Sequence, residues 1–155
     1  MRDVTNIVIA GLGGQGVLTA ADIVANVALH AGFDVKKSEL HGMSQRGGSL
    51  ASDVRFGTVV FSPMVPAGEA DFLVAIEPDQ IPVHRSLLRE GGIVIDPTSL
   101  GQYRLRNNKS MNVALLGILS RHLQFPPDAW DGAIRRAFPN HLVEVNLEAF
   151  ALGRA

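Results

Sequence analysis

The chain of 155 residues contains no cysteine. This absence excludes disulfide bonds, a thiol nucleophile and an iron–sulfur cluster held by this chain alone, because all three need cysteine sulfur. The five histidines offer no pair at the i, i+4 spacing of a helical metal site, which argues against structural zinc. Any redox metal that this protein works with is therefore expected on another chain.

Long hydrophobic runs and an excess of one charge are also missing. The apolar segments 5–12 and 70–76 are too short to cross a bilayer, and no charged leader precedes an apolar stretch at the amino terminus. The formal net charge is −1, and no basic stripe marks a nucleic-acid surface. We expect a cytoplasmic protein that binds neither membrane nor nucleic acid.

The first forty residues carry the pattern of an α/β fold. Residues 4–10 are rich in β-branched side chains and predict a buried strand. Residues 15–31 have apolar side chains at helical spacing, which predicts a helix packed on a sheet. A second short strand is expected over 33–37. This strand–helix–strand order with short turns favours a parallel sheet.

The rest of the chain adds strands and helices to the same domain. We expect a β-hairpin of 52–55 and 58–61, strands at 71–76 and 93–96 with a turn at Gly91-Gly92, and helices over 78–88, 110–123, 126–137 and 143–152. No linker divides the sequence. The prediction is a single domain over residues 1–155, a Rossmann-like three-layer α/β domain with a mostly parallel sheet plus a β-hairpin.

A glycine-rich turn, Gly-Leu-Gly-Gly-Gln-Gly, joins the first predicted strand to the first helix. It has the G-x-G-x-x-G spacing of a phosphate-binding turn, in the required context. Glycines let a ligand approach the backbone, and free N–H groups at a helix start attract anions. The candidate phosphate-binding residues are Gly11, Gly13, Gly14, Gln15 and Gly16. Close packing of helix on strand needs the same glycines, so both interpretations stay open.

The second strand tests whether the turn binds a plain dinucleotide. An NAD site expects an acidic residue about 20 residues beyond the turn. Here Lys36 and Lys37 come before Glu39, which suits a phosphate-bearing ribose better than a free one. One alternative is therefore a stand-alone oxidoreductase that binds NADP or another nucleotide.

The segment His-Gly-Met-Ser-Gln-Arg-Gly-Gly over 41–48 has neither helical nor strand periodicity. Arg46 can present its planar guanidinium to a carboxylate or phosphate, and His41 can exchange protons near neutral pH. Ser44, like Gln15, is a candidate hydrogen-bond donor. Asn112, at the start of a predicted helix, is either an N-cap or an amide that faces a channel. The alternative for the segment is a loop with a solvated arginine.

The glycine turn, the segment SELHGMSQRGG and the following SDVRFG together resemble the small, gamma-type subunit of 2-oxoacid:ferredoxin oxidoreductases. These motifs are most similar to those of the beta subunit of the indolepyruvate:ferredoxin oxidoreductases. The resemblance continues through SPMVPAGEADFLVAIEP, MNVALLG and EVNLEAFALG, and so covers most of the chain. One departure is the short connection between Asp96 and Ser110, where family members usually have a longer stretch with another strand.

The resemblance implies an oxidoreductase subunit that is inactive alone. Such complexes oxidatively decarboxylate a 2-oxoacid of the indolepyruvate or pyruvate type, reduce ferredoxin and transfer the acyl group to coenzyme A. Thiamine diphosphate and iron–sulfur clusters are expected in a large partner subunit, and none in this chain. By this resemblance Arg46 and His41 are the catalytic candidates. Substrate or coenzyme A is expected to contact Gly11, Gly13, Gly14, Gln15, Gly16, Ser44, Arg46, Gly47 and Asn112.

Two further expectations concern assembly. The small subunit helps to form the substrate and coenzyme A channel and packs against the large subunit, and it meets ferredoxin only through the complex. When isolated, it can form a homo-oligomer through the exposed docking face. The remaining alternative is a non-catalytic assembly module.

Overall fold

The computed structural model describes residues 3–41, 48–102 and 104–155. In this part of the chain, strands β1 to β5 form one sheet in the order β2-β3-β1-β4-β5. Their bounds are Val4–Leu12, Asp34–His41, Ser49–Gly57, Ala70–Ala75 and Leu88–Ile95. β3 is antiparallel to both β1 and β2, whereas β1 with β4 and β4 with β5 are parallel pairs. Four of the five strands thus run in one direction and β3 runs in the other, so the sheet is mostly, but not wholly, parallel, which confirms the predicted α/β class.

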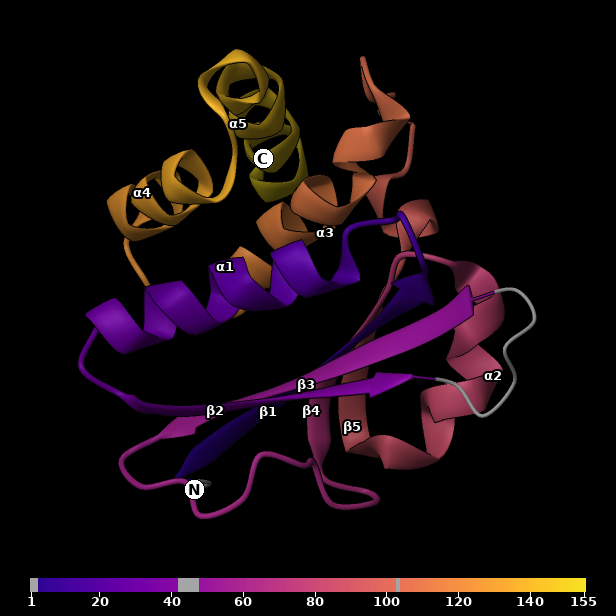
Figure 1. Ribbon diagram of the computed structural model, residues 1–155. Helices are drawn as coiled ribbons and strands as arrows, with labels where there is room; N and C mark the ends of the chain where they lie inside the picture. Colours follow the sequence, from indigo (N-terminus) through magenta and orange to yellow (C-terminus); the bar gives the residue numbers. More distant parts are fainter. Residues whose placement is uncertain (1–2, 42–47, 103) are drawn as a thin grey trace.

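Helices cover one face of the sheet more thickly than the other (Figure 1). On the thick side lie α1 (Val17–His30), α3 (Met111–Ser120), α4 (Pro127–Ala137) and α5 (Asn140–Arg154). The other face is covered by the short α2 (Ile81–His84), its flanking 3₁₀ turns and the loop 58–69. No helix of the described segments is long and apolar enough to cross a membrane.

Alternation along β1 produces the two cores. Ile7 and Ile9 point to the helices and join the larger cluster around Trp130, whereas Val8 and Ala10 point to the thin side. Successive side chains of a strand face opposite sides of a sheet, so a fully buried strand needs apolar residues at every position. The consecutive β1 residues Ile7, Val8, Ile9 and Ala10 are all apolar and buried, and so meet that requirement.

The predicted hairpin of 52–55 and 58–61 is wrong. β3 runs without interruption to Gly57 and pairs along its whole length with β1, and residues 58–69 contain no strand. Gly57 is not a turn residue. It lets the β3 backbone approach the backbone of Asp3 closely, because a Cβ on Gly57 would lie 2.2 Å from the Asp3 carbonyl oxygen. The hairpin that does exist joins β2 to β3.

The predicted turn at Gly91-Gly92 is also wrong, because β5 continues through both glycines. The pairing with β4 shifts register between Ala70 and Phe72, as at a β-bulge. Gly91 has φ of +79°, a backbone conformation that glycine adopts without strain. The glycine pair, which predicted a turn in the sequence, therefore lies at an irregularity inside a strand.

Two glycines let α3 and α5 cross in direct backbone contact. A Cβ on Gly153 would lie 1.9 Å from the Ala114 carbonyl oxygen, and a Cβ on Gly117 would lie 2.2 Å from the Phe150 carbonyl oxygen. Neither helix can accept a larger residue there without moving away.

The thin side of the sheet carries a buried carboxylate, Asp53 on β3, with an exposed fraction of 1%. Burial raises the pKa of Asp53 above its usual 3.8, while the Val65 N–H and nearby Arg55 act in the opposite direction. A raised folded-state pKa means that the acid form favours folding, and that this contribution is lost as pH rises through the folded-state pKa. Asp53→Asn cannot ionise, so we expect its stability to lack this dependence on pH. As pH rises from 3 to 7, the free energy of unfolding of wild type is therefore expected to fall relative to that of the variant.

Asp34 provides the control with the opposite sign. Its pKa is lowered from 3.8 by the Val60 N–H and by Lys36. A carboxylate whose pKa is lowered in the folded state stabilises the fold at pH values above its unfolded-state pKa. This contribution is lost as pH falls through the folded-state pKa. Wild type is therefore expected to gain stability relative to Asp34→Asn as pH rises. Denaturant unfolding at pH 3, 5 and 7 measures both differences, and equal slopes for the two variants would contradict the assignment.

Candidate functional site

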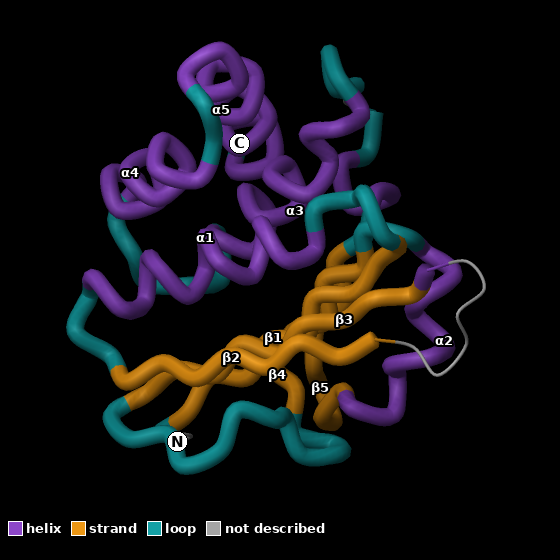
Figure 2. The backbone as a smooth tube through the Cα atoms, viewed as in Figure 1, coloured by secondary structure: helices purple, strands orange, loops and turns teal. Residues whose placement is uncertain are grey.

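The candidate site lies where the chain connections diverge at the carboxyl ends of β1 and β4. After β1 the chain crosses the helical face through α1 toward one edge of the sheet, and after β4 it crosses the thin face through α2 toward the other edge. Parallel α/β sheets bind ligands in the crevice that forms at such a switch point. Figure 2 shows the loop after β1 passing over these strand ends, beside the start of α3.

The glycine turn adopts a conformation that needs glycine at two positions. Gly14 and Gly16 have φ of +87° and +81°. Gly13 and Gly14 are exposed, and the Gly13 N–H donates to the Gly48 carbonyl oxygen at 2.8 Å. Gly11 is buried, and a Cβ on it would lie 2.8 Å from the Gln15 side-chain oxygen. Gly11 is thus needed for packing, whereas Gly13 and Gly14 are exposed, and phosphate binding by the turn stays a prediction.

Gln15 braces the turn from inside. Its Oε1 accepts from the Leu12 N–H at 2.7 Å, and its Nε2 donates to Glu77 Oε1 at 3.2 Å. The side chain therefore ties the turn after β1 to the segment that follows β4. Glu77 was missed in the sequence, although its position directly after a buried strand end is a usable signal for a residue at the crevice.

Asn112 joins α3 to the glycine turn. Ser110 occupies the N-cap position of α3, so the N-cap interpretation of Asn112 is wrong. Asn112 is 3% exposed and its Nδ2 donates to the Gly16 carbonyl oxygen at 3.1 Å. Its Oδ1 is buried without a hydrogen-bond partner among the described residues. The side chain lies so close to the turn that a Cβ on Gly16 would be 2.3 Å from Asn112 Nδ2.

A pocket of about 330 Å³ opens beside the turn. It is lined by Gly14, Gln15, Ile76, Pro97, Asn108, Lys109 and Met111. Lys109 is an exposed cation next to the start of α3, whose N–H groups and dipole favour negative charge. Sequence reasoning missed Pro97, Asn108 and Lys109 because it treated 97–109 only as a connection. The combination of the exposed Gly14 amide, one ammonium group and a helix start suits an anionic group on a ligand.

The remaining predicted residues cluster in one segment. Ser44, Arg46 and Gly47 lie outside the described residues, and so does the His41 side chain, so their roles stay predictions. The His41 backbone ends β2 opposite Leu50, and the Gly48 carbonyl oxygen accepts a hydrogen bond from the Gly13 N–H. Gly48, the described end of this segment, therefore lies against the glycine turn. In the described residues no group of three His, Cys, Asp or Glu side chains is arranged for a metal.

Lys36 and Lys37, which favoured NADP in the sequence, lie on β2, and this strand is not next to β1. β3 separates β2 from β1, whereas a dinucleotide fold sets the second strand beside the first. Lys36 pairs with Asp34 at 2.9 Å, and Lys37 pairs with Asp22 and Glu39. This arrangement disfavours the nucleotide alternative.

Comparison with known proteins decides the family. The sequence matches the pattern described as pyruvate ferredoxin/flavodoxin oxidoreductase over residues 6–155. The chain belongs to this family. It is 35% identical to indolepyruvate oxidoreductase subunit IorB of Thermococcus kodakarensis, across 96% of this chain and 93% of that subunit. Ketoisovalerate oxidoreductase subunit VorA of Methanothermobacter marburgensis is 34% identical across 74% of this chain, which corresponds to 24% of VorA. The resemblance seen in the sequence is confirmed.

Solved structures share the fold. The chain superposes with a TM-score of 0.83 on 2-oxoglutarate:ferredoxin oxidoreductase from Magnetococcus marinus, at 18% identity, over 99% of this chain and 31% of that chain. The gamma subunit of a keto/oxoacid ferredoxin oxidoreductase from Geobacter sulfurreducens gives 0.76 at 24% identity, over 96% of this chain and 95% of that one. The alignment with the Thermococcus kodakarensis subunit spans 188 positions, so that relative carries residues with no counterpart in this shorter family member.

Proposed function

We propose that this chain is the small subunit of a 2-oxoacid:ferredoxin oxidoreductase of the indolepyruvate or pyruvate type, inactive alone. The observation that carries the proposal is the match to indolepyruvate oxidoreductase subunit IorB over almost the full length of both chains. A larger partner would hold thiamine diphosphate and the iron–sulfur clusters, which supply the decarboxylation and electron transfer. The lack of cysteine in this chain agrees with that division, because clusters need thiolate ligands.

The pocket beside the glycine turn is our candidate contact for coenzyme A. The phosphates of coenzyme A are anions. The exposed Gly14 amide and the Lys109 ammonium group offer them a hydrogen-bond donor and positive charge at the pocket. The Magnetococcus marinus enzyme, which shares this fold, was solved with coenzyme A and succinyl-CoA bound. Gln15, Glu77 and Asn112 would act as positioning residues, because they hold the turn against β4 and α3.

The test is reconstitution with the larger subunit of the same organism, purified with its thiamine diphosphate and clusters. Ferredoxin reduction with indolepyruvate or pyruvate is expected only when both chains and coenzyme A are present. Full activity of the large subunit alone would contradict the proposal, as would micromolar binding of NADPH by the isolated chain.

Lys109→Glu tests the pocket within that complex. Loss of a charge-assisted hydrogen bond to a phosphate is expected to raise the KM for coenzyme A about tenfold, with an unchanged KM for the oxoacid. Arg121→Glu is the matched control, because Arg121 is an exposed cation at the opposite end of α3. Equal KM values for coenzyme A in the two variants would refute the role of the pocket and leave the subunit assignment intact.

A further inference from the structure

The loop 58–69, between β3 and β4, exposes three apolar side chains. Phe61 has an exposed fraction of 92%, Met64 of 51% and Val59 of 50%. These three residues are termed the apolar loop surface below. Single exposed hydrophobic residues are common, but three within six residues of one loop form a patch that water covers at a cost.

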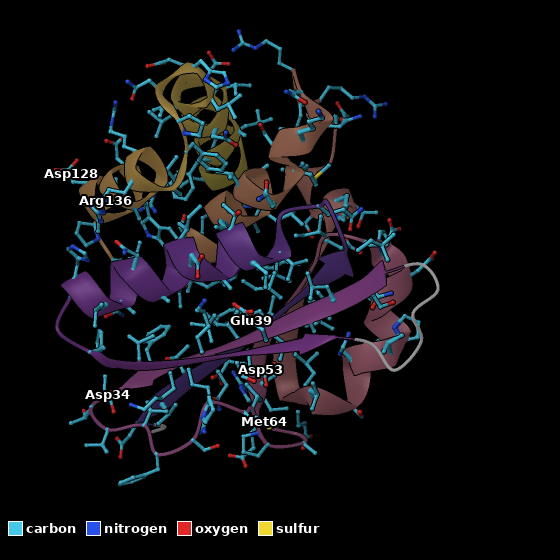
Figure 3. All side chains as sticks on the ribbon, in the orientation of Figure 1. Asp34, Glu39, Asp53, Met64, Asp128 and Arg136 are labelled. Carbon is cyan, nitrogen blue, oxygen red and sulfur yellow. The ribbon has the colours of Figure 1, made fainter. Side chains whose placement is uncertain are left out.

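The loop is held in place from the sheet side. Asp34 Oδ2 accepts from the Val60 N–H at 2.8 Å, and Asp53 Oδ2 accepts from the Val65 N–H at 2.9 Å. Val60 and Val65 are themselves buried, at 3% and 5% exposed. The backbone is thus anchored on both sides of Phe61 and Met64. Figure 3 shows Asp53 and Met64 near each other, and Asp34 farther to the left, on the side of the sheet away from the long helices.

Two further side chains clamp the same loop. Arg55 Nη1 donates to the Ser62 carbonyl oxygen at 2.8 Å and to the Met64 carbonyl oxygen at 3.3 Å. Asn6 Nδ2 donates to the Glu69 carbonyl oxygen at 3.0 Å. A loop ordered before association loses little conformational entropy on binding, and exposed aromatic side chains on such loops are typical anchors of interfaces.

The position of the loop separates it from the candidate pocket. It joins the end of β3, which pairs with the first residues of β1, to the first residue of β4. It therefore lies at the amino ends of β1 and β4, whereas the glycine turn lies at their carboxyl ends. A protein bound to the apolar loop surface leaves the pocket beside the glycine turn open to a small ligand.

The size of the patch argues against a second copy of this chain as the occupant. An aromatic side chain buries roughly 150–250 Å². Three side chains thus supply only a few hundred Å², well below the roughly 1,000 Å² of a stable interface. The patch fits an anchor within a larger contact, made with a partner that also holds the chain elsewhere.

The relatives indicate which partner this is. The fold forms 31% of a longer chain in the Magnetococcus marinus enzyme and matches 24% of VorA, but it makes up nearly all of IorB and of the Geobacter sulfurreducens subunit. Where the domain is a separate chain, side-chain contacts must replace the covalent link. We propose that the apolar loop surface docks onto the larger oxidoreductase subunit, with Phe61 inserted into an apolar pocket of that subunit. This inference rests on the proposed function.

The experiment measures binding of the purified full-length chain to the purified larger subunit. Phe61→Asp is expected to weaken binding about 30-fold or more, as for an aromatic hot spot, with an unchanged thermal midpoint because Phe61 is exposed. Leu29→Asp is the matched control, since Leu29 is 60% exposed but lies on α1, across the sheet. The control is expected to bind like wild type.

The outcomes separate the two proposals. If wild type does not bind the larger subunit, the proposed function fails and this inference with it. If wild type and Phe61→Asp bind equally, only the docking surface is refuted. Sedimentation of the isolated chain adds a third arm, because a dimer that Phe61→Asp abolishes would assign the surface to a second copy and overturn the proposal.

Discussion

Gly153→Ala is expected to lower the free energy of unfolding by about 3 kcal/mol or more, the upper range for overpacking in a core. The added methyl group would lie 1.9 Å from the Ala114 carbonyl oxygen and 3.1 Å from the Ile118 nitrogen. Both are backbone atoms of α3, which no side-chain rotation can move aside. The two helices must separate, and the buried side chains around the crossing lose their contacts. Denaturant titration measures the loss.

Gly132→Ala is the control for this crossing. Gly132 also lies inside a helix, α4, but the nearest atom to an added Cβ is the end of the Arg136 side chain, at 3.2 Å. Alanine has the better helix propensity, so this variant is expected to gain up to about 1 kcal/mol. If both substitutions changed stability by the same amount, the direct backbone contact of α3 with α5 would be refuted.

Gly16→Ala is expected to lower the free energy of unfolding by about 2–5 kcal/mol and to damage the candidate site. A residue with a side chain pays about 1–2 kcal/mol at φ of +81°, and the displaced Asn112 amide loses a buried hydrogen bond worth roughly 1–3 kcal/mol. In the reconstituted complex the KM for coenzyme A is expected to rise as well, because the turn and the start of α3 move apart. Unfolding curves and steady-state kinetics measure the two effects.

Gly14→Ala separates backbone strain from the clash. Gly14 has φ of +87°, but nothing lies within 4 Å of an added Cβ, so only about 1–2 kcal/mol is expected. The double variant Gly16→Ala/Asn112→Ala removes the clashing amide, and its cost should fall below the sum of the two single costs. Additive costs, or equal costs at Gly14 and Gly16, would contradict the role given to Asn112.

Local patterns in the sequence predicted the elements whose limits are set locally. The proline pair at 126–127 marks the start of α4, and the strand–glycine–helix order at 4–31 is present as expected. The predicted helix over 143–152 is longer, from Asn140 to Arg154. Limits of this kind depend on capping and on propensity, which are read from neighbouring residues.

Features set by distant residues were not predictable in this way. Gly57 looked like a turn residue, but the Asp3 backbone that requires it lies more than fifty positions away. The antiparallel insertion of β3 between β2 and β1 is a property of pairing, which periodicity does not encode. Lys109 reaches the pocket only because the loop before α3 returns to the glycine turn.

The strand order has a consequence for how this subunit can associate. β2 and β5 are the outer strands of the sheet in the described part of the chain. β2 carries Lys36, Lys37 and Glu39, and β5 contains the irregularity at Gly91. Charged side chains and bulges on outer strands oppose the addition of a foreign strand. We therefore expect the protein to avoid fibril-like stacking and β-augmentation, and to assemble through its loops.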